Sequence, residues 1–175
     1  GLHPLQVVFL RNVCALAFMA PFIFRTGFGV LRTKRLKLHL ARGFCFFLGQ
    51  STWFAALPHM PLMDANALFF TAPIFITILA AVVLGETVRW RRWAAVVVGF
   101  IGAIVVLKPG SEEMTIWHLM MVGNALTWSV SALIMRATSA TDGASTIVAY
   151  MFLCVTPLSF IPAMAFWKTL GLEQA

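Results

Sequence analysis

Arg11 is the first residue whose chemistry needs an explanation, because it stands inside an apolar run, PLQVVFLRNVCALAFMAPFIF. An arginine within hydrocarbon is costly unless its guanidinium faces a cavity or a partner group. Two interpretations are open. Arg11 contacts an anionic or polar ligand inside a membrane, or it is a structural cation that reaches outward to the interface or binds carbonyls at a helix end.

A side-chain amide stands among aromatic rings in the apolar run over residues 38–57. Gln50 shares a helical face with Trp53, Phe46, Phe47 and Phe54. This combination suits a planar metabolite, which would stack on the rings and form a hydrogen bond with the amide. The simpler interpretation, which the residues favour slightly, is that Gln50 binds a neighbouring helix.

Polar stripes recur in three later apolar runs. Residues 62–84 carry Asn66, Phe70, Pro73 and Thr77, residues 115–135 carry Trp117, Asn124, Thr127, Trp128 and Ser131, and residues 145–167 carry Thr146, Tyr150, Cys154 and Pro157. Polar faces are costly when they contact lipid, so these stripes are expected to face a lumen or the interior of a bundle. Pro73 cannot donate to the carbonyl of Phe69, which predicts a kink that is either a hinge or a fixed bend.

Gln50, Pro73 and Asn124 stand at similar depths in their runs, as a binding site at the middle of a membrane requires. We therefore expect Gln50, Asn124 and Trp128 to approach one pocket. The expected substrate-binding set is Arg11, Gln50, Trp53, Asn66, Thr77, Asn124, Trp128, Ser131 and Tyr150, with Pro73 and Pro157 as hinges.

Two features indicate structural roles. Glu86 could carry a proton, but it precedes Arg89 by three residues, and a solvated ion pair or a helix-terminus role is the favoured interpretation. Ala95, Gly99 and Ala103 form a strip of small residues, with Gly102 beside it, which predicts close contact with another helix.

No catalytic or metal-binding set emerges from the sequence. The four histidines are scattered, and the chain contains no HExxH, GxSxG or phosphate-loop motif. The three cysteines lie far apart in apolar runs without a CxxC motif, so they are expected to be reduced and buried. An enzyme is therefore not expected, and neither is a cofactor.

The composition excludes a soluble protein. Hydrophobic residues make up 61% of the 175 residues and charged residues 11%, whereas soluble domains hold about 45–50% apolar and about 25% charged residues. Six spans are expected, over residues 4–24, 38–57, 62–84, 93–107, 115–135 and 145–167. The net charge of +7 arises from cations in short loops, which is the positive-inside pattern and does not indicate nucleic-acid binding.

The loop over residues 25–42 carries six Lys and Arg residues and should be cytosolic, as should residues 89–92 and 136–143. Alternation then places residues 58–61, residues 108–114 and the start of the chain outside. The first and sixth spans match weakly at an offset of 141, for example Pro21 with Pro162. Because this offset covers five spans, an odd number, such a repeat would be inverted in the membrane.

The run from Leu57 to Gly110 resembles the end of the first repeat of an EamA-type transporter of the drug/metabolite transporter superfamily. The resemblance lies in Pro73 within a helix of small residues, in Leu84-Gly85-Glu86 before a basic and aromatic hinge, and in a glycine-containing helix that ends in Lys108-Pro109-Gly110. The opening run, with Arg11, is similar to the family's second helix, so the resemblance covers nearly the whole chain.

The resemblance implies an all-α polytopic membrane bundle with ten helices in two inverted repeats of five. This chain would hold the second to seventh helices, with residues 1–110 in the first repeat and 111–175 in the second. The opening without Met also suggests a fragment. The implied function is secondary transport of a small polar or amphipathic metabolite across a bacterial inner membrane, with metabolite and lipid as partners and the oligomeric state left open. A membrane scaffold without transport activity is the alternative, and an enzyme of lipid-linked substrates is a weaker one.

Overall fold

The computed structural model describes residues 4–85, 87–107 and 115–165. These residues form the α-helices α1 (Pro4–Thr26), α2 (Leu36–Ala56), α3 (Leu62–Phe69), α4 (Ala72–Val83), α5 (Trp90–Leu107), α6 (Ile116–Ser139) and α7 (Ala144–Ala165), with short 3-10 turns η1 (Phe28–Leu31) and η2 (Leu57–His59). Each expected apolar run is helical. An α-helix satisfies its own backbone hydrogen bonds, which a chain in hydrocarbon requires.

The run over residues 62–84 forms two helices rather than one. A turn at Phe70 and Thr71 separates α3 from α4, and Pro73 lies in the first turn of α4, where its missing N–H costs little. The Ser129 hydroxyl of α6 donates to the carbonyl of Ala72 over 2.9 Å. The predicted kink near Pro73 is therefore present as a break in the helix, whereas α7 continues unbroken through Pro157.

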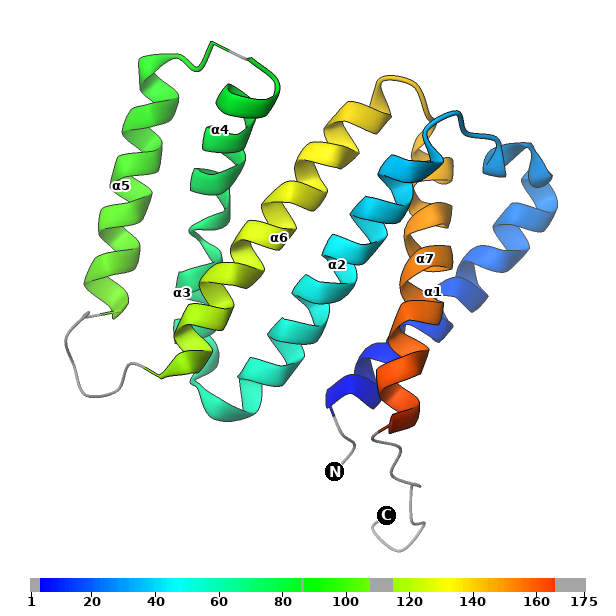
Figure 1. Cartoon of the computed structure of the whole chain (residues 1–175), viewed down its shortest axis with the longest axis horizontal. Coiled ribbons are helices and arrows are strands. Elements are labelled where there is room, and N and C mark those ends of the chain that lie inside the picture. Colours follow the sequence, from blue (N-terminus) through cyan, green and yellow to red (C-terminus); the bar gives the residue numbers. More distant parts are fainter. Residues whose placement is uncertain (1–3, 86, 108–114, 166–175) are drawn as a thin grey trace, which may run out of the picture.

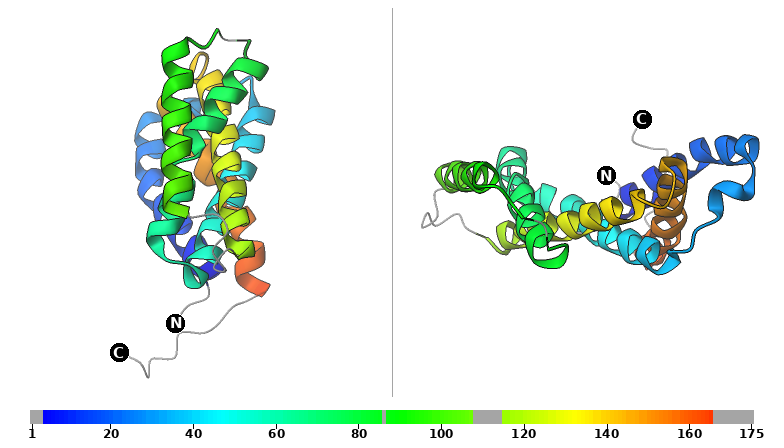
Figure 2. Two further views of the ribbon diagram at one scale, coloured as in Figure 1. Left: turned by 90° about the vertical axis from the view of Figure 1, so that its left-hand side faces the viewer. Right: turned by 90° about the horizontal axis from the view of Figure 1, so that it is seen from above.

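The helices lie side by side in an open layer. Figure 1 shows successive spans running in opposite directions, with α3 and α4 together making one span. From α5 at one edge the order is α3 and α4, then α6, α2, α7 and finally α1, as the view from above in Figure 2 shows. α2 therefore lies in the middle of the layer, packed against α6 and α7.

The basic connections gather at one end of this layer. The segments that lead into α2, from α4 to α5 and from α6 to α7 all lie at the top of Figure 1. They or their flanking turns carry Arg32, Lys34, Arg35, Arg89 and Arg136. This clustering agrees with the alternation expected from the sequence, and the positive-inside rule predicts that this end is cytosolic.

One part of the expected cytosolic loop is instead helical. α2 begins at Leu36, so residues 36–42 are its first turns, and Arg42 is buried. The prediction of a loop over the whole of residues 25–42 is therefore wrong. A run rich in Lys and Arg can continue a helix because both residues favour helical structure.

Four helical segments among the described residues are long and apolar enough to cross a membrane, namely Leu5–Arg25, Leu62–Val83, Ile116–Ser139 and Ala144–Met164. α2 lies between α6 and α7, so it must cross the same hydrocarbon layer as these two helices. Apolar side chains cover the outer surface, especially on α5, where Val98 is 69% exposed. This surface suits lipid.

Glycines allow α2 to approach its neighbours closely. An added Cβ at Gly43 would lie 2.5 Å from the Cβ of Cys154 in α7, and one at Gly49 would lie 3.1 Å from Oγ1 of Thr127 in α6. In α5, by contrast, a Cβ added at Gly99 or Gly102 meets no described atom within 4 Å. The close contact expected at Gly99 is therefore not found among the described residues, because Ala95, Gly99 and Gly102 line a cavity of about 660 Å³ between α5 and α4, called here the α4–α5 cavity.

Gly43→Ala should destabilise the protein, because the new Cβ would overlap that of Cys154. Overpacking of this kind costs about 1–3 kcal/mol, so thermal unfolding of the detergent-solubilised protein should occur at a lower temperature. Gly123→Ala in α6 is the matched control, since a Cβ there meets no atom within 4 Å. Equal unfolding temperatures for the two variants would show that α2 and α7 do not pack this closely.

Candidate functional site

Four helices meet around a cavity of about 260 Å³, called here the aromatic cavity. α1 contributes one residue, and α2, α3 and α6 contribute the rest. The lining residues are Arg11, Phe46, Gly49, Gln50, Trp53, Phe54, Asn66, Phe69, Asn124 and Trp128.

Aromatic rings from three helices form a continuous wall of this cavity. The ring centroid of Trp128 lies 5.5 Å from that of Phe46 and 5.6 Å from that of Phe69. Phe69 in turn meets Trp53 edge-on, with centroids 5.6 Å apart. Such a wall can accept a planar group by stacking or by edge-to-face contact.

Gln50 supplies a hydrogen-bond donor that the described chain does not use. Its side chain is 7% exposed, and its Oε1 accepts a long bond of 3.4 Å from Nδ2 of Asn12, but its buried Nε2 has no partner among the described residues. Leaving a buried donor unpaired costs free energy. A ligand in the cavity would recover that cost by accepting from Nε2.

Two further amides are held in place by backbone carbonyls. Nδ2 of Asn124 donates to the carbonyl of Gly49 over 2.7 Å, which ties α6 to α2 at the cavity. Nδ2 of Asn66 donates to the carbonyl of Leu62 over 2.8 Å. Both amides are thereby oriented beside the cavity, so their polar groups would need little reorganisation to bind a ligand.

Arg11 lines the cavity from α1, and its side chain is exposed. It makes no hydrogen bond or ion pair with any described residue. Its neighbour Asn12 is buried and donates to Gln50 and, over 3.5 Å, to the Ser159 hydroxyl of α7. Sequence reasoning missed Asn12, although a polar residue in an apolar run was the available signal.

The structure brings together six residues of the expected set: Arg11, Gln50, Trp53, Asn66, Asn124 and Trp128. Three others lie elsewhere. Thr77 lines the α4–α5 cavity and donates to the carbonyl of Pro73 over 2.8 Å. The Tyr150 hydroxyl donates to the carbonyl of Leu31 over 2.7 Å. Ser131 belongs to a separate cavity, and α7 contributes no lining residue to the aromatic cavity.

That separate cavity, called here the Arg42 cavity, measures about 340 Å³ and lies between α2, α6 and α7. Its lining residues are Arg42, Phe46, Trp128, Ser131, Ala132, Met135 and Met151. Phe46 and Trp128 line the aromatic cavity too, so the two spaces adjoin at these two rings.

The α4–α5 cavity is larger than the aromatic cavity but has fewer polar groups in its lining. Its walls are mainly alkyl groups, with Thr77 and Arg92 as the polar lining residues. Specific binding needs polar groups that converge on a ligand, and these are found in the aromatic cavity. We therefore take the aromatic cavity as the candidate site.

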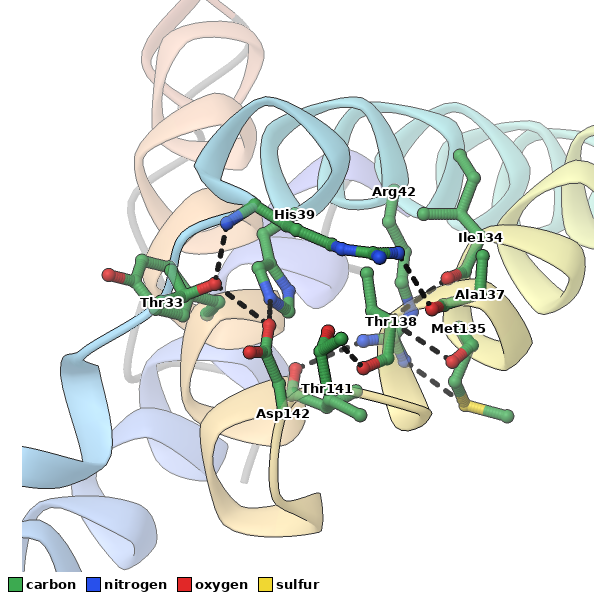
Figure 3. Close-up of polar contacts among 12 residues, drawn as sticks. Thr33, His39, Arg42, Ile134, Met135, Ala137, Thr138, Thr141 and Asp142 are labelled. Atoms are coloured by element: carbon green, nitrogen blue, oxygen red, sulfur yellow. Dashed lines mark hydrogen bonds and ion pairs between the residues drawn. The ribbon is translucent and has the colours of Figure 1, made fainter.

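A polar cluster at the basic end joins the start of α2 to the connection between α6 and α7 (Figure 3). His39 is 1% exposed, and its Nε2 lies 2.7 Å from Oδ2 of Asp142, which also accepts from Oγ1 of Thr33 over 2.8 Å. Arg35 donates to the carbonyl of Ala137 over 3.1 Å. We call these residues the His39 cluster.

The contacts of the His39 cluster lower the pKa of Asp142 below its ordinary value of 3.8. The hydrogen bond from His39 is the largest cause and that from Thr33 the next, while burial acts in the opposite direction. Electrostatic interactions with His39 and with Arg35 also lower this pKa. The carboxylate form of Asp142 therefore helps to hold α2 against the connection between α6 and α7.

Comparison with known proteins gives consistent results. The model of the EamA-like transporter family matches residues 1–108. The chain is 32% identical over 170 residues to a riboflavin transporter of Vibrio cholerae and 31% identical over 168 residues to an S-adenosylmethionine uptake transporter of Rickettsia felis, covering in each case 96% of this chain and 57% of the relative.

A pseudopaline exporter of Pseudomonas aeruginosa is 27% identical over 160 residues, which cover 91% of this chain and 56% of the exporter. The chain thus spans little more than half the length of these relatives. No solved structure matches the chain.

Asp142 should make the stability of the protein depend on pH. Because its pKa is lowered by folding, its contribution is fully present above 3.8 and is lost as the pH falls below that value through the lowered pKa. Thermal unfolding followed from neutral pH down through 3.8 should show this loss. Asp142→Asn should lack that part of the pH dependence.

Asp64→Asn is the matched control, since Asp64 lies in the first turn of α3 at the opposite end of the layer. This variant should lose stability at low pH as the wild type does. If Asp142→Asn retained the pH profile of the wild type, the contact between Asp142 and His39 would not contribute to stability.

Proposed function

The chain belongs to the EamA-like transporter family, and on that basis we propose that it forms the substrate-binding part of a secondary transporter. The transporter would move a small polar or amphipathic metabolite across the membrane by alternating access. The aromatic cavity would be its binding site, with Arg11, Gln50, Trp53, Asn66, Asn124 and Trp128 in contact with the substrate.

One observation carries this proposal: a cavity inside the membrane-spanning layer combines an aromatic wall with the unpaired Nε2 of Gln50. Polar groups at membrane depth are costly, and they are retained where they line a pathway. Riboflavin and S-adenosylmethionine, for which relatives are named, both carry a planar ring system joined to polar groups. Rings of Trp128, Phe46 and Trp53 would stack on such a ring system, and Gln50 would bind one of its acceptors.

Alternating access needs elements that can change their arrangement. We propose that the break before Pro73 is one hinge and that Pro157 is a second. We also propose two inverted repeats over residues 1–110 and 111–175. In support, α1 and α7, which the offset of 141 relates, pack together and run in opposite directions (Figure 1). Gly99 and Gly102 would have structural roles in α5. Glu86, for which the sequence also predicts a structural role, lies outside the described residues.

The bacterial sources of the relatives support a bacterial inner membrane as the location. A scaffold without transport activity is the alternative. It would account for the exposed apolar surface, but it gives no reason for an unpaired amide donor beside stacked rings. Catalysis has weaker support, since the described residues hold no group of three His, Cys, Asp or Glu side chains that could bind a metal.

Trp128→Ala should abolish most transport while leaving membrane insertion intact, because Trp128 closes the wall between Phe46 and Phe69. Loss of stacking and of apolar burial together amounts to about 3 kcal/mol, or roughly a hundredfold in affinity. Uptake of riboflavin and of S-adenosylmethionine into reconstituted vesicles would measure the effect.

Trp90→Ala is the control, since Trp90 is 73% exposed on α5, away from the cavity. It should transport like the wild type. Normal uptake by Trp128→Ala would remove the aromatic cavity from the pathway and favour the scaffold.

A further inference from the structure

Arg42 is a buried cation without an acidic partner among the described residues. Its side chain is 6% exposed, and its Nη1 donates to the carbonyl of Ile147 in α7 over 3.0 Å. Its Nη2 contacts the Sδ atoms of Met135 and Met151 over 3.6 and 3.5 Å, and its Nε has no partner in the described chain. Figure 3 shows the guanidinium directed toward Met135 of α6.

These contacts leave the hydrogen-bonding capacity and the charge of Arg42 poorly satisfied. A guanidinium carries five N–H donors, and thioether sulfur is only a weak acceptor. A charge taken out of water needs a counter-charge and good hydrogen bonds to offset its lost hydration. The described residues supply Arg42 with one carbonyl and two sulfur atoms, and none of these groups carries a negative charge.

The described residues do not supply that charge from nearby. The acidic residues that the structure describes are Asp64 and Asp142. Asp64 lies at the opposite end of the layer, and Asp142 is engaged by His39 and Thr33. His39, one turn before Arg42 on the same helix, is turned toward Asp142 and does not offset the charge of Arg42.

Arg42 faces a space that can hold a ligand. The Arg42 cavity measures about 340 Å³ and also contains the side chain of Ser131, a second hydrogen-bonding group. Phe46 and Trp128, which bound the aromatic cavity, form its other wall. Gln50 follows Arg42 by eight positions, which corresponds to about 12 Å along α2. One metabolite could therefore reach from Gln50 to Arg42.

We propose that the Arg42 cavity is a subsite for an anionic group, a phosphate or carboxylate, of the transported metabolite. The substrate class would then be a planar ring joined by a chain to an anion, with the ring in the aromatic cavity and the anion on Arg42, beyond Phe46 and Trp128. This assignment rests on the proposed function for the identity of the ligand, while the affinity of Arg42 for an anion is independent of it.

Inorganic phosphate tests the anion site directly. In phosphatidylcholine nanodiscs, with chloride used to keep the ionic strength constant, phosphate should raise the unfolding temperature of the wild type and of Arg32→Gln, an exposed cation at the same end. It should not raise that of Arg42→Gln. If the wild type gains nothing, or if Arg42→Gln gains as much, the proposal is overturned.

A second measurement needs no variant and so does not depend on Arg42→Gln folding. Phosphate should protect Arg42 of the wild type from modification by phenylglyoxal, as read by mass spectrometry, and an unprotected Arg42 would contradict the site. If phosphatidylglycerol protects Arg42 without added phosphate and phosphate adds nothing, the ligand is a lipid headgroup, and the assignment to the metabolite is overturned.

The link to the metabolite is tested with riboflavin and flavin mononucleotide, which share one ring and differ by one phosphate. Flavin mononucleotide should protect Arg42 at about one-tenth of the concentration that riboflavin requires, because a hydrogen-bonded ion pair is worth about that factor. Equal protection by both would overturn the subsite. If riboflavin uptake fails while phosphate still protects Arg42, the proposed transport function fails and the anion site stands.

Discussion

The close approach of α2 to α6 and α7 is the constraint on which the rest of the structure depends. Gly43 and Gly49 remove the side chains that would separate these helices, and the amide of Asn124 then reaches the carbonyl of Gly49. With α2 fixed in this position, its aromatic face meets Phe69 and Trp128, its middle bears Gln50, and its first turns carry Arg42 and His39 into the layer. A wider spacing would let lipid or water into both cavities.

α2 is also where the described residues leave buried polar atoms unpaired: His39 Nδ1, Arg42 Nε, Gln50 Nε2 and Ser51 Oγ. In a water-soluble protein such atoms would be a modest defect, but at membrane depth the solvent offers no replacement partner. Two of these residues line cavities, Gln50 the aromatic cavity and Arg42 the cavity named after it. The unpaired N–H groups of Gln50 and Arg42 on α2 are therefore the groups that a ligand in these cavities would bind.

Much of this arrangement could be predicted from the sequence, because hydrophobic runs define helices and polar residues at helical spacing define faces. Gln50, Asn124 and Trp128 do line one cavity, since polarity and depth together limit where such side chains can go.

The helix that each polar side chain contacts was harder to predict. Thr77 and Tyr150 face the interior as expected, but Thr77 lines the α4–α5 cavity and Tyr150 stacks on His39 of the His39 cluster. Arg42 was taken for a loop cation, because only the position of α7 shows that it is buried. The close helix contact predicted from the small residues of α5 could not be judged from the sequence for the same reason. How near another helix comes to Gly99 depends on the position of that helix.

We propose that the aromatic cavity opens alternately to the two sides of the membrane. In a cysteine-free background, Asn66→Cys would place one thiol on the cavity wall, and Val97→Cys would place one on the exposed apolar surface of α5. A charged, membrane-impermeant thiol reagent should modify the cysteine at position 66 when added from either side, more slowly with riboflavin or S-adenosylmethionine present, and should spare the one at position 97. Equal resistance to the reagent at both positions would contradict alternating access to the cavity.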